Sequence, residues 1–127
     1  MNEPAVLPRQ ASPADERSLR KDTLAMVLVV LPILLMVALF LWLGATYNSL
    51  PDLLPLHFDA QGNPDRIVDR EEIFVLPIIG LITNVVNVGG GLLLRQRFNK
   101  TFAPYLLWSG ALLVQVLIWI AIWNITQ

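Results

Sequence analysis

Residues 24–45 read LAMVLVVLPILLMVALFLWLGA and contain no charged side chain. The hydrocarbon core of a bilayer is about 30 Å thick and needs roughly 20 apolar helical residues, because unpaired backbone groups in lipid cost several kcal/mol. Two more stretches meet this requirement: 73–94, IFVLPIIGLITNVVNVGGGLLL, and 104–123, PYLLWSGALLVQVLIWIAIW. Together with the 55% hydrophobic composition, they predict an all-α membrane protein with three transmembrane helices.

A cleaved signal peptide is the alternative interpretation of the first stretch, because Arg17, Arg20 and Lys21 precede it. The apolar run is longer than the roughly 7–15 residues of a signal peptide, and no small-x-small cleavage site closes it. We therefore expect a retained helix.

Basic residues are distributed unevenly around the three stretches. The 46–72 connection contains only Arg66 and Arg70, whereas seven basic residues flank the other side: Arg9, Arg17, Arg20, Lys21, Arg95, Arg97 and Lys100. Basic residues tend to stay in the cytoplasm. We expect a multi-pass protein of the cell membrane, with the N-terminus cytoplasmic and both the 46–72 connection and the C-terminus outside.

The net charge of −1 hides an acidic outer connection. Its charge is −4, from two Arg against Asp52, Asp59, Asp65, Asp69, Glu71 and Glu72. A charged partner on this face should therefore be cationic. The absence of Cys excludes disulfides and thiolate chemistry.

The polar N-terminus divides into two parts. Residues 1–12 are rich in Pro and Ala and are expected to form a disordered cytoplasmic arm, with 13–127 as the three-span membrane domain. Ser12 followed by Pro13 is typical of a helix start. We expect the first helix to run from there into the membrane, with a modest kink at Pro32.

The second helix is expected to begin near Asp69, with Glu72 completing an acidic capping box. Within it, small and polar residues fall on one face, which should pack against another helix. This face contains Gly80, Thr83, Asn84, Asn87 and Gly91, and the third helix offers Ser109, Gly110 and Gln115 opposite it. Gln115 could hydrogen-bond an Asn amide. A polar conduction or ligand path is the alternative, although no ionisable residue marks a span.

The connection 47–70 is expected to fold into a compact irregular or hairpin-like loop. Pro51 and Pro55 favour extended backbone, 56–58 is a short strand candidate, and 59–62 has Asp first and Gly last, as in a turn. Four apolar side chains should dip toward the bilayer, namely Leu53, Leu54, Leu56 and Phe58. Asp59, Asn63, Asp65 and Arg66 should stay in water.

Within this loop, residues 50–66 read LPDLLPLHFDAQGNPDR. The run resembles a motif, LPxxIPxHFxxxGxPDR, of a bacterial membrane domain of unknown function. That domain is shared with the N-terminal part of Sdp-type immunity proteins, which protect cells from a secreted sporulation-delaying peptide toxin. In those proteins the motif also lies between the first two spans. The residues that match are Pro51, Pro55, His57, Phe58, Gly62, Pro64, Asp65 and Arg66.

Three chemical interpretations of the loop remain open. His57 with Asp59, Asp65 and Asp69 could ligate a divalent cation, but they lack a recognised ligand spacing, and we expect no metal or cofactor. His57 could act as a general base, but no nucleophile or oxyanion donor accompanies it, so we expect no enzyme. A structural role, with His57 hydrogen-bonded across the loop, and with Asp65 paired with Arg66 or capping a backbone N–H, is favoured.

The favoured function is a binding or immunity-like membrane protein whose outer loop recognises a peptide or a membrane-protein partner. The candidate binding residues are His57, Phe58, Asp59, Asp65 and Arg66. An accessory or structural subunit is the alternative, followed by a small transporter component. Self-association is possible through the packing face, and nucleic acid is not an expected partner because basic residues are few and lie beside lipid.

Overall fold

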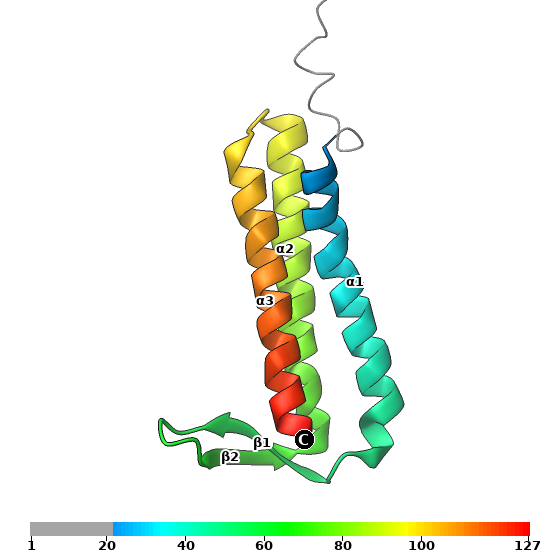
Figure 1. Cartoon of the computed structure of the whole chain (residues 1–127), viewed down its shortest axis with the longest axis vertical. Helices are drawn as coiled ribbons and strands as arrows, with labels where there is room; N and C mark the ends of the chain where they lie inside the picture. Colours follow the sequence, from blue (N-terminus) through cyan, green and yellow to red (C-terminus); the bar gives the residue numbers. More distant parts are fainter. Residues whose placement is uncertain (1–21) are drawn as a thin grey trace, which may run out of the picture.

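The computed structural model describes residues 22–127 and consists of three long helices with a small hairpin across one end (Figure 1). All three helices are long and apolar enough to cross a membrane. The elements are α1 (Thr23–Thr46), η1 (Tyr47–Ser49), β1 (Leu53–Phe58), β2 (Pro64–Asp69), η2 (Arg70–Phe74), α2 (Val75–Arg97) and α3 (Phe102–Thr126). Three helices were predicted and are confirmed, but the two-stranded hairpin means that the chain is mostly helical, not all-α.

Helix α1 begins at Thr23, so the prediction that it runs continuously from Pro13 is wrong. Asp22 has an extended backbone (φ −105°, ψ 94°), and its Oδ1 accepts a hydrogen bond from the Ala25 amide at 3.0 Å. Asp22 is therefore the N-cap of α1. The predicted cap Ser12 and the arm 1–12 lie outside the described residues.

The predicted capping box at the start of the second helix does not form. Asp69 is the last residue of β2, where it pairs with Leu53, and its side chain makes no capping hydrogen bond. Glu72 instead accepts a hydrogen bond from Arg66 at 3.3 Å. The chain passes through the 3₁₀ turn η2 before α2 starts, because strand pairing fixes the backbone up to Asp69.

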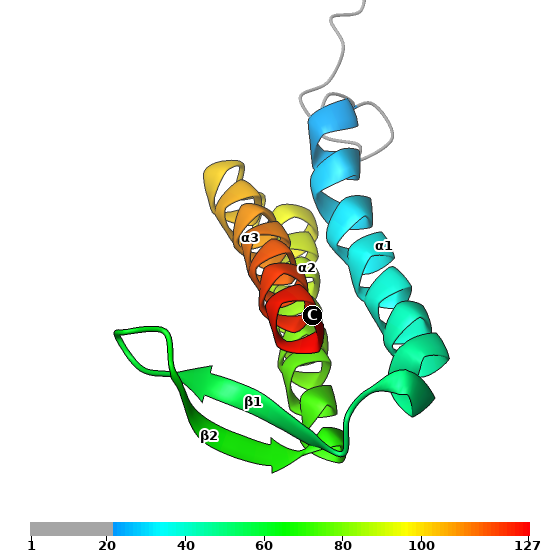
Figure 2. The same cartoon turned by 60° about the horizontal axis from the view of Figure 1, so that its bottom comes forward.

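Helices α2 and α3 lie side by side, with α1 along one side of the pair (Figure 2). Two buried clusters hold them together. The cluster near the hairpin contains Leu39, Leu43, Leu50, Leu54, Ile73, Ile118, Ile122 and Ile125. The cluster at the opposite end contains Ala25, Val88, Trp108 and Ala111. Leu, Ile and Val side chains also cover the outward faces of all three helices, as expected for helices surrounded by lipid and not by water.

The small and polar residues of α2 lie between helices of this chain. Gly80, Asn84 and Gly91 are buried, and Asn87 is half-buried. The Asn84 amide donates to the Pro32 carbonyl of α1 at 3.1 Å. Thr83 bonds back to the Ile79 carbonyl of its own helix instead of reaching a neighbour.

Gln115 of α3 is fully buried and donates from Nε2 to the Gly80 carbonyl at 3.0 Å. The expected bond to an Asn amide is therefore replaced by a bond to backbone. The missing side chain at Gly80 explains this choice, because a Cβ there would lie 2.8 Å from Nε2. On the same helix, Gly110 faces Asn87, whereas Ser109 is exposed.

Candidate functional site

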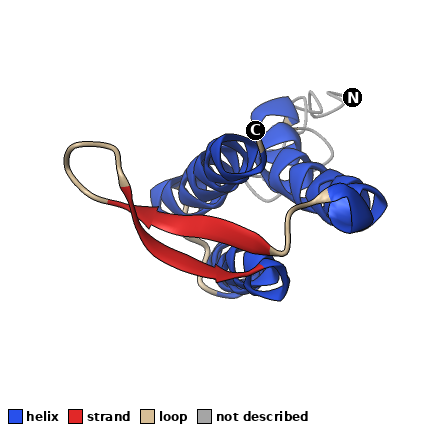
Figure 3. Cartoon of the chain, turned by 90° about the horizontal axis from the view of Figure 1, so that it is seen from below, coloured by secondary structure: helices blue, strands red, loops and turns tan. Residues whose placement is uncertain are grey.

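The hairpin lies across the helix ends, and its turn extends beyond the bundle (Figure 3). β1 and β2 are antiparallel, and the register shifts twice, between Pro55 and His57 and between His57 and Phe58. Such shifts bend a strand pair and redirect its side chains. The bend separates an anchored half of the hairpin, residues 53–55 and 67–69, from a projecting half, residues 56–66.

The turn of the hairpin is built around Asp59. Its Oδ1 accepts hydrogen bonds from the amides of Gln61 at 2.9 Å and Asn63 at 2.8 Å. The Asn63 amide is the main cause that lowers the pKa of Asp59 below its ordinary value. Gly62 has a φ of 84°, which a residue with a Cβ rarely adopts. The turn predicted at 59–62 is confirmed, and the Asp59 carboxylate is already engaged in it.

His57 and Asp65 form the central pair of the projecting half. Nδ1 of His57 lies 2.5 Å from Oδ1 of Asp65, and both side chains are well exposed, at 67% and 44%. The structural interpretation of His57, a hydrogen bond across the loop, agrees with this geometry. Asp65 was expected to pair with Arg66 or to cap a backbone N–H, whereas it pairs with His57, and Arg66 reaches Glu72.

The anchored half of the hairpin is fixed to the bundle by apolar and cationic contacts. Leu54 and Val68, which face each other across the strands, are both buried. Arg70 donates to the Leu50 carbonyl at 3.4 Å, and its guanidinium lies 5.0 Å from the centre of the Tyr47 ring. The sequence analysis did not single out Arg70. Tyr47, an aromatic residue at the start of the loop, was the available signal, because an arginine can stack on an aromatic ring.

The four apolar side chains that were expected to dip toward the bilayer differ in their burial. Leu54 joins the core near the hairpin and Leu56 packs against it. Leu53 and Phe58 remain exposed, and so does Ile67 of β2. Leu54 and Leu56 therefore contact protein, because the hairpin packs on helix ends that offer them a core, and the placement of all four side chains relative to the bilayer stays a prediction.

The metal-site interpretation required several ligands to converge. Within residues 22–127, no three His or acidic side chains are grouped so that they could hold a metal ion. Asp59 bonds within its own turn, and His57 and Asp65 bond to each other. The projecting half thus presents an imidazole–carboxylate pair, a guanidinium and exposed apolar side chains, which suit binding to another molecule.

Comparison with known proteins adds the family context of this hairpin. The model of a family described as Domain of unknown function (DUF1648) matches residues 33–81, from within α1 through the hairpin into α2. Residues 33–81 of the chain are therefore similar to this domain. This confirms the resemblance to a domain of unknown function; the link to Sdp-type immunity proteins stays a prediction.

One similar curated protein is an uncharacterized protein of Archaeoglobus fulgidus, 49% identical over 41 residues. The aligned part is 31% of this chain and 22% of the relative, so the chain spans about a fifth of the length of the curated relative it matches. No solved structure matches the chain. The DUF1648 match contains the whole hairpin, including all five candidate binding residues.

Proposed function

We propose that this chain is a multi-pass membrane protein that binds a peptide through the projecting half of its hairpin. The observation that carries the proposal is the division of the hairpin. Leu54 and Val68 are buried, and Leu54 belongs to the core of the bundle, while His57, Phe58 and Arg66 are exposed beyond the bend. A passive connection would need neither the anchor nor the bends. Binding residues are often found on loops held by a rigid scaffold.

The chemistry of the surface favours an amphipathic, cationic peptide. Phe58 of the projecting half and Ile67, which pairs with Pro55 just before the bend, are exposed to 40% and 62% and offer contact area for apolar residues. The connection 46–72 has a charge of −4, which attracts basic residues. The resemblance of residues 50–66 to Sdp-type immunity proteins adds a secreted peptide toxin as a specific candidate.

The accessory-subunit alternative depended on the Gly and Asn face of α2. Gly80, Asn84 and Gly91 are covered by α1 and α3 of the same chain, so this face is not offered to another protein. The hairpin is therefore the better candidate surface.

The test uses the full chain in phosphatidylcholine nanodiscs and two synthetic peptides of equal length. One peptide alternates Leu and Lys to form an amphipathic cation, and the other has Glu in place of Lys. We expect the cationic peptide to bind at least about tenfold more tightly to loaded than to empty nanodiscs, which corresponds to roughly 1.4 kcal/mol. His57→Ala, Asp65→Ala and Phe58→Ala should remove this difference.

Glu71→Gln is the matched control, because Glu71 is an exposed acid of η2 outside the hairpin. It should retain most of the binding, because it removes only one of the six acidic charges of the connection 46–72. Equal binding to loaded and empty nanodiscs would refute recognition of cationic peptides. If His57→Ala and Asp65→Ala lose protease resistance together with binding, these residues hold the fold and the recognition role should be abandoned.

A further inference from the structure

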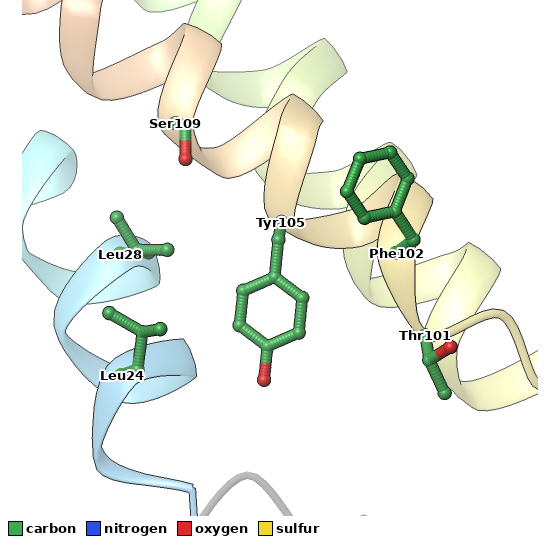
Figure 4. Close-up of a pocket in the computed structure, with 6 residues that line it drawn as sticks. All are labelled: Leu24, Leu28, Thr101, Phe102, Tyr105 and Ser109. Carbon is green, nitrogen blue, oxygen red and sulfur yellow. The ribbon is translucent and has the colours of Figure 1, made fainter.

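A groove lies between α1 and α3 at the end of the bundle opposite the hairpin (Figure 4). Its volume is about 580 Å³. The lining residues are Leu24, Leu28, Thr101, Phe102, Tyr105 and Ser109. Leu24 and Leu28 of α1 face Tyr105 and Ser109 of α3 across the gap, so the walls of the groove belong to different helices.

A polar cluster holds the walls of this groove in place. Both terminal nitrogens of Arg95 donate to Oδ2 of Asp22 at 3.3 Å, and the Tyr105 hydroxyl donates to the same oxygen. The guanidinium of Arg95 also lies 5.9 Å from the ring centre of Trp108. The cluster joins the residue that caps α1, the last turns of α2 and the first turns of α3, so these three helix ends are fixed relative to one another.

The lining is mainly apolar, and two basic residues lie close to it in the sequence, at the same end of the bundle. Leu24, Leu28 and Phe102 offer hydrocarbon surface, and Phe102 is 72% exposed. Lys100 immediately precedes the lining residue Thr101, and Arg97 ends α2 at the same end of the bundle. Both basic side chains are exposed, and no salt bridge to residues 22–127 is recorded for either. Asp22 balances Arg95, so among residues 22–127 this end of the bundle has a charge of +2, from Arg97 and Lys100.

We infer that the groove binds one acyl chain of an anionic phospholipid, whose phosphate contacts Lys100 and Arg97 at the rim. An apolar groove between helices that face lipid is filled by lipid chains, and basic residues at the membrane surface attract anionic headgroups. The inference rests on the membrane placement in the proposed function but not on peptide recognition by the hairpin.

The test places the photoreactive residue p-benzoylphenylalanine at position 102, where it replaces the exposed Phe102 without changing the groove's other walls. The full chain is inserted into vesicles with equal amounts of phosphatidylglycerol and phosphatidylcholine and irradiated, and the adducts are identified by mass. We expect phosphatidylglycerol adducts to exceed phosphatidylcholine adducts several-fold. Ser109→Trp, which fills the groove, should suppress both adducts.

Removal of the rim charges separates headgroup recognition from random labelling by bulk lipid. Arg97→Gln with Lys100→Gln should bring the two adducts to equal amounts. Arg66→Gln removes one positive charge at the hairpin end and should leave the preference unchanged. Melting temperatures of all variants check that the fold is kept, and Lys100→Gln alone should give an intermediate ratio.

Several results would overturn the inference. The first is equal amounts of phosphatidylglycerol and phosphatidylcholine adducts when Arg97 and Lys100 are both present. The second is a preference for phosphatidylglycerol that persists when both are replaced by Gln. The third is crosslinking to residues 1–21 or to a second copy of the chain instead of to lipid. The peptide assay on the hairpin is independent of this measurement, so loss of peptide binding with a retained lipid preference would affect only the recognition role. Release of the chain from membranes by alkaline extraction would remove the common premise of both.

Discussion

The indole of Trp108 on α3 packs against Gly91 of α2, and its Nε1–H donates to the Val88 carbonyl at 3.3 Å. A Cβ at position 91 would lie 2.8 Å from Cδ1 and 2.9 Å from Cε2 of the indole. Trp108 is fully buried, so it has no free space in which to withdraw. The close approach of α2 and α3 at this end depends on the absence of a side chain at Gly91.

Gly91→Ala should therefore destabilise the helix bundle. Overpacking a filled interior costs about 1–3 kcal/mol, which should appear as a lower melting temperature in detergent. Gly89→Ala is the matched control, because nothing lies within 4 Å of its added Cβ and Ala favours helix over Gly by roughly 1 kcal/mol. Equal melting temperatures for the two variants would show that the Trp108 contact does not limit helix packing.

The two Asn residues of α2 should contribute unequally. Asn84 is buried and donates to the Pro32 carbonyl, whereas Asn87 is half-buried against Gly110. Asn84→Leu should weaken the attachment of α1 by about 0.6–2 kcal/mol, the range for hydrogen bonds between membrane helices. The loss should be toward the low end, because Oδ1 of Asn84 is buried without a donor among the described residues.

Melting temperatures of the single and double Leu variants in detergent measure this difference. The double variant should resemble Asn84→Leu and should still insert into membranes. An effect of Asn87→Leu as large as that of Asn84→Leu would contradict the assignment of the interhelical bond to Asn84.

The three helices were predictable because length and the absence of charge determine a candidate span locally. The predicted stretches 24–45 and 104–123 lie within α1 and α3, whose ends extend them by one to three residues. The turn at 59–62 was predictable for the same reason: Asp59 and Gly62 fix it through bonds and a φ angle within a few residues.

The hydrogen-bond partners of side chains on different helices and strands could not be predicted in the same way. Glu72 suited a capping box by spacing, yet the folded hairpin brings Arg66 within reach of it. Gln115 suited an Asn amide by residue type, yet the backbone at Gly80 is nearer because α2 and α3 pack closely there. In both cases the deciding factor is tertiary geometry, which a pattern along one element does not contain.

Acid should weaken the end of the bundle that contains Asp22. The Tyr105 hydroxyl, followed by the Ala25 amide, lowers the pKa of Asp22 from its ordinary value of 3.8. The unfolded chain therefore binds the proton first as the pH falls. The stabilisation is complete above the ordinary pKa and is lost as the pH falls below it toward the pKa of the folded state.

Asp22→Asn is the informative variant, because Asn keeps the helix cap but not the charge that pairs with Arg95. The difference in melting temperature between the unmodified chain and this variant should be largest near neutral pH and should shrink below about pH 4. Asp52→Asn is the control and should change the melting temperature little, since the Asp52 side chain is 92% exposed. A difference that stays constant down to about pH 3 would exclude Asp22 as the titrating group.

The placement of the chain across the membrane gives the last prediction. The hairpin and Gln127 lie at one end of the bundle, and Asp22 and the connection between α2 and α3 lie at the other (Figure 1). Arg95, Arg97 and Lys100 lie at the second end, and four more basic residues precede Asp22 in the sequence, so this end should face the cytoplasm. Because the chain has no native Cys, single cysteines at Ser12, Gln61 and Gln127 can be labelled cleanly with an impermeant maleimide. Intact cells should label at Gln61 and Gln127, and at Ser12 only after permeabilisation. Labelling of Ser12 without Gln61 would reverse the orientation, and opposite results at Gln61 and Gln127 would contradict three spans.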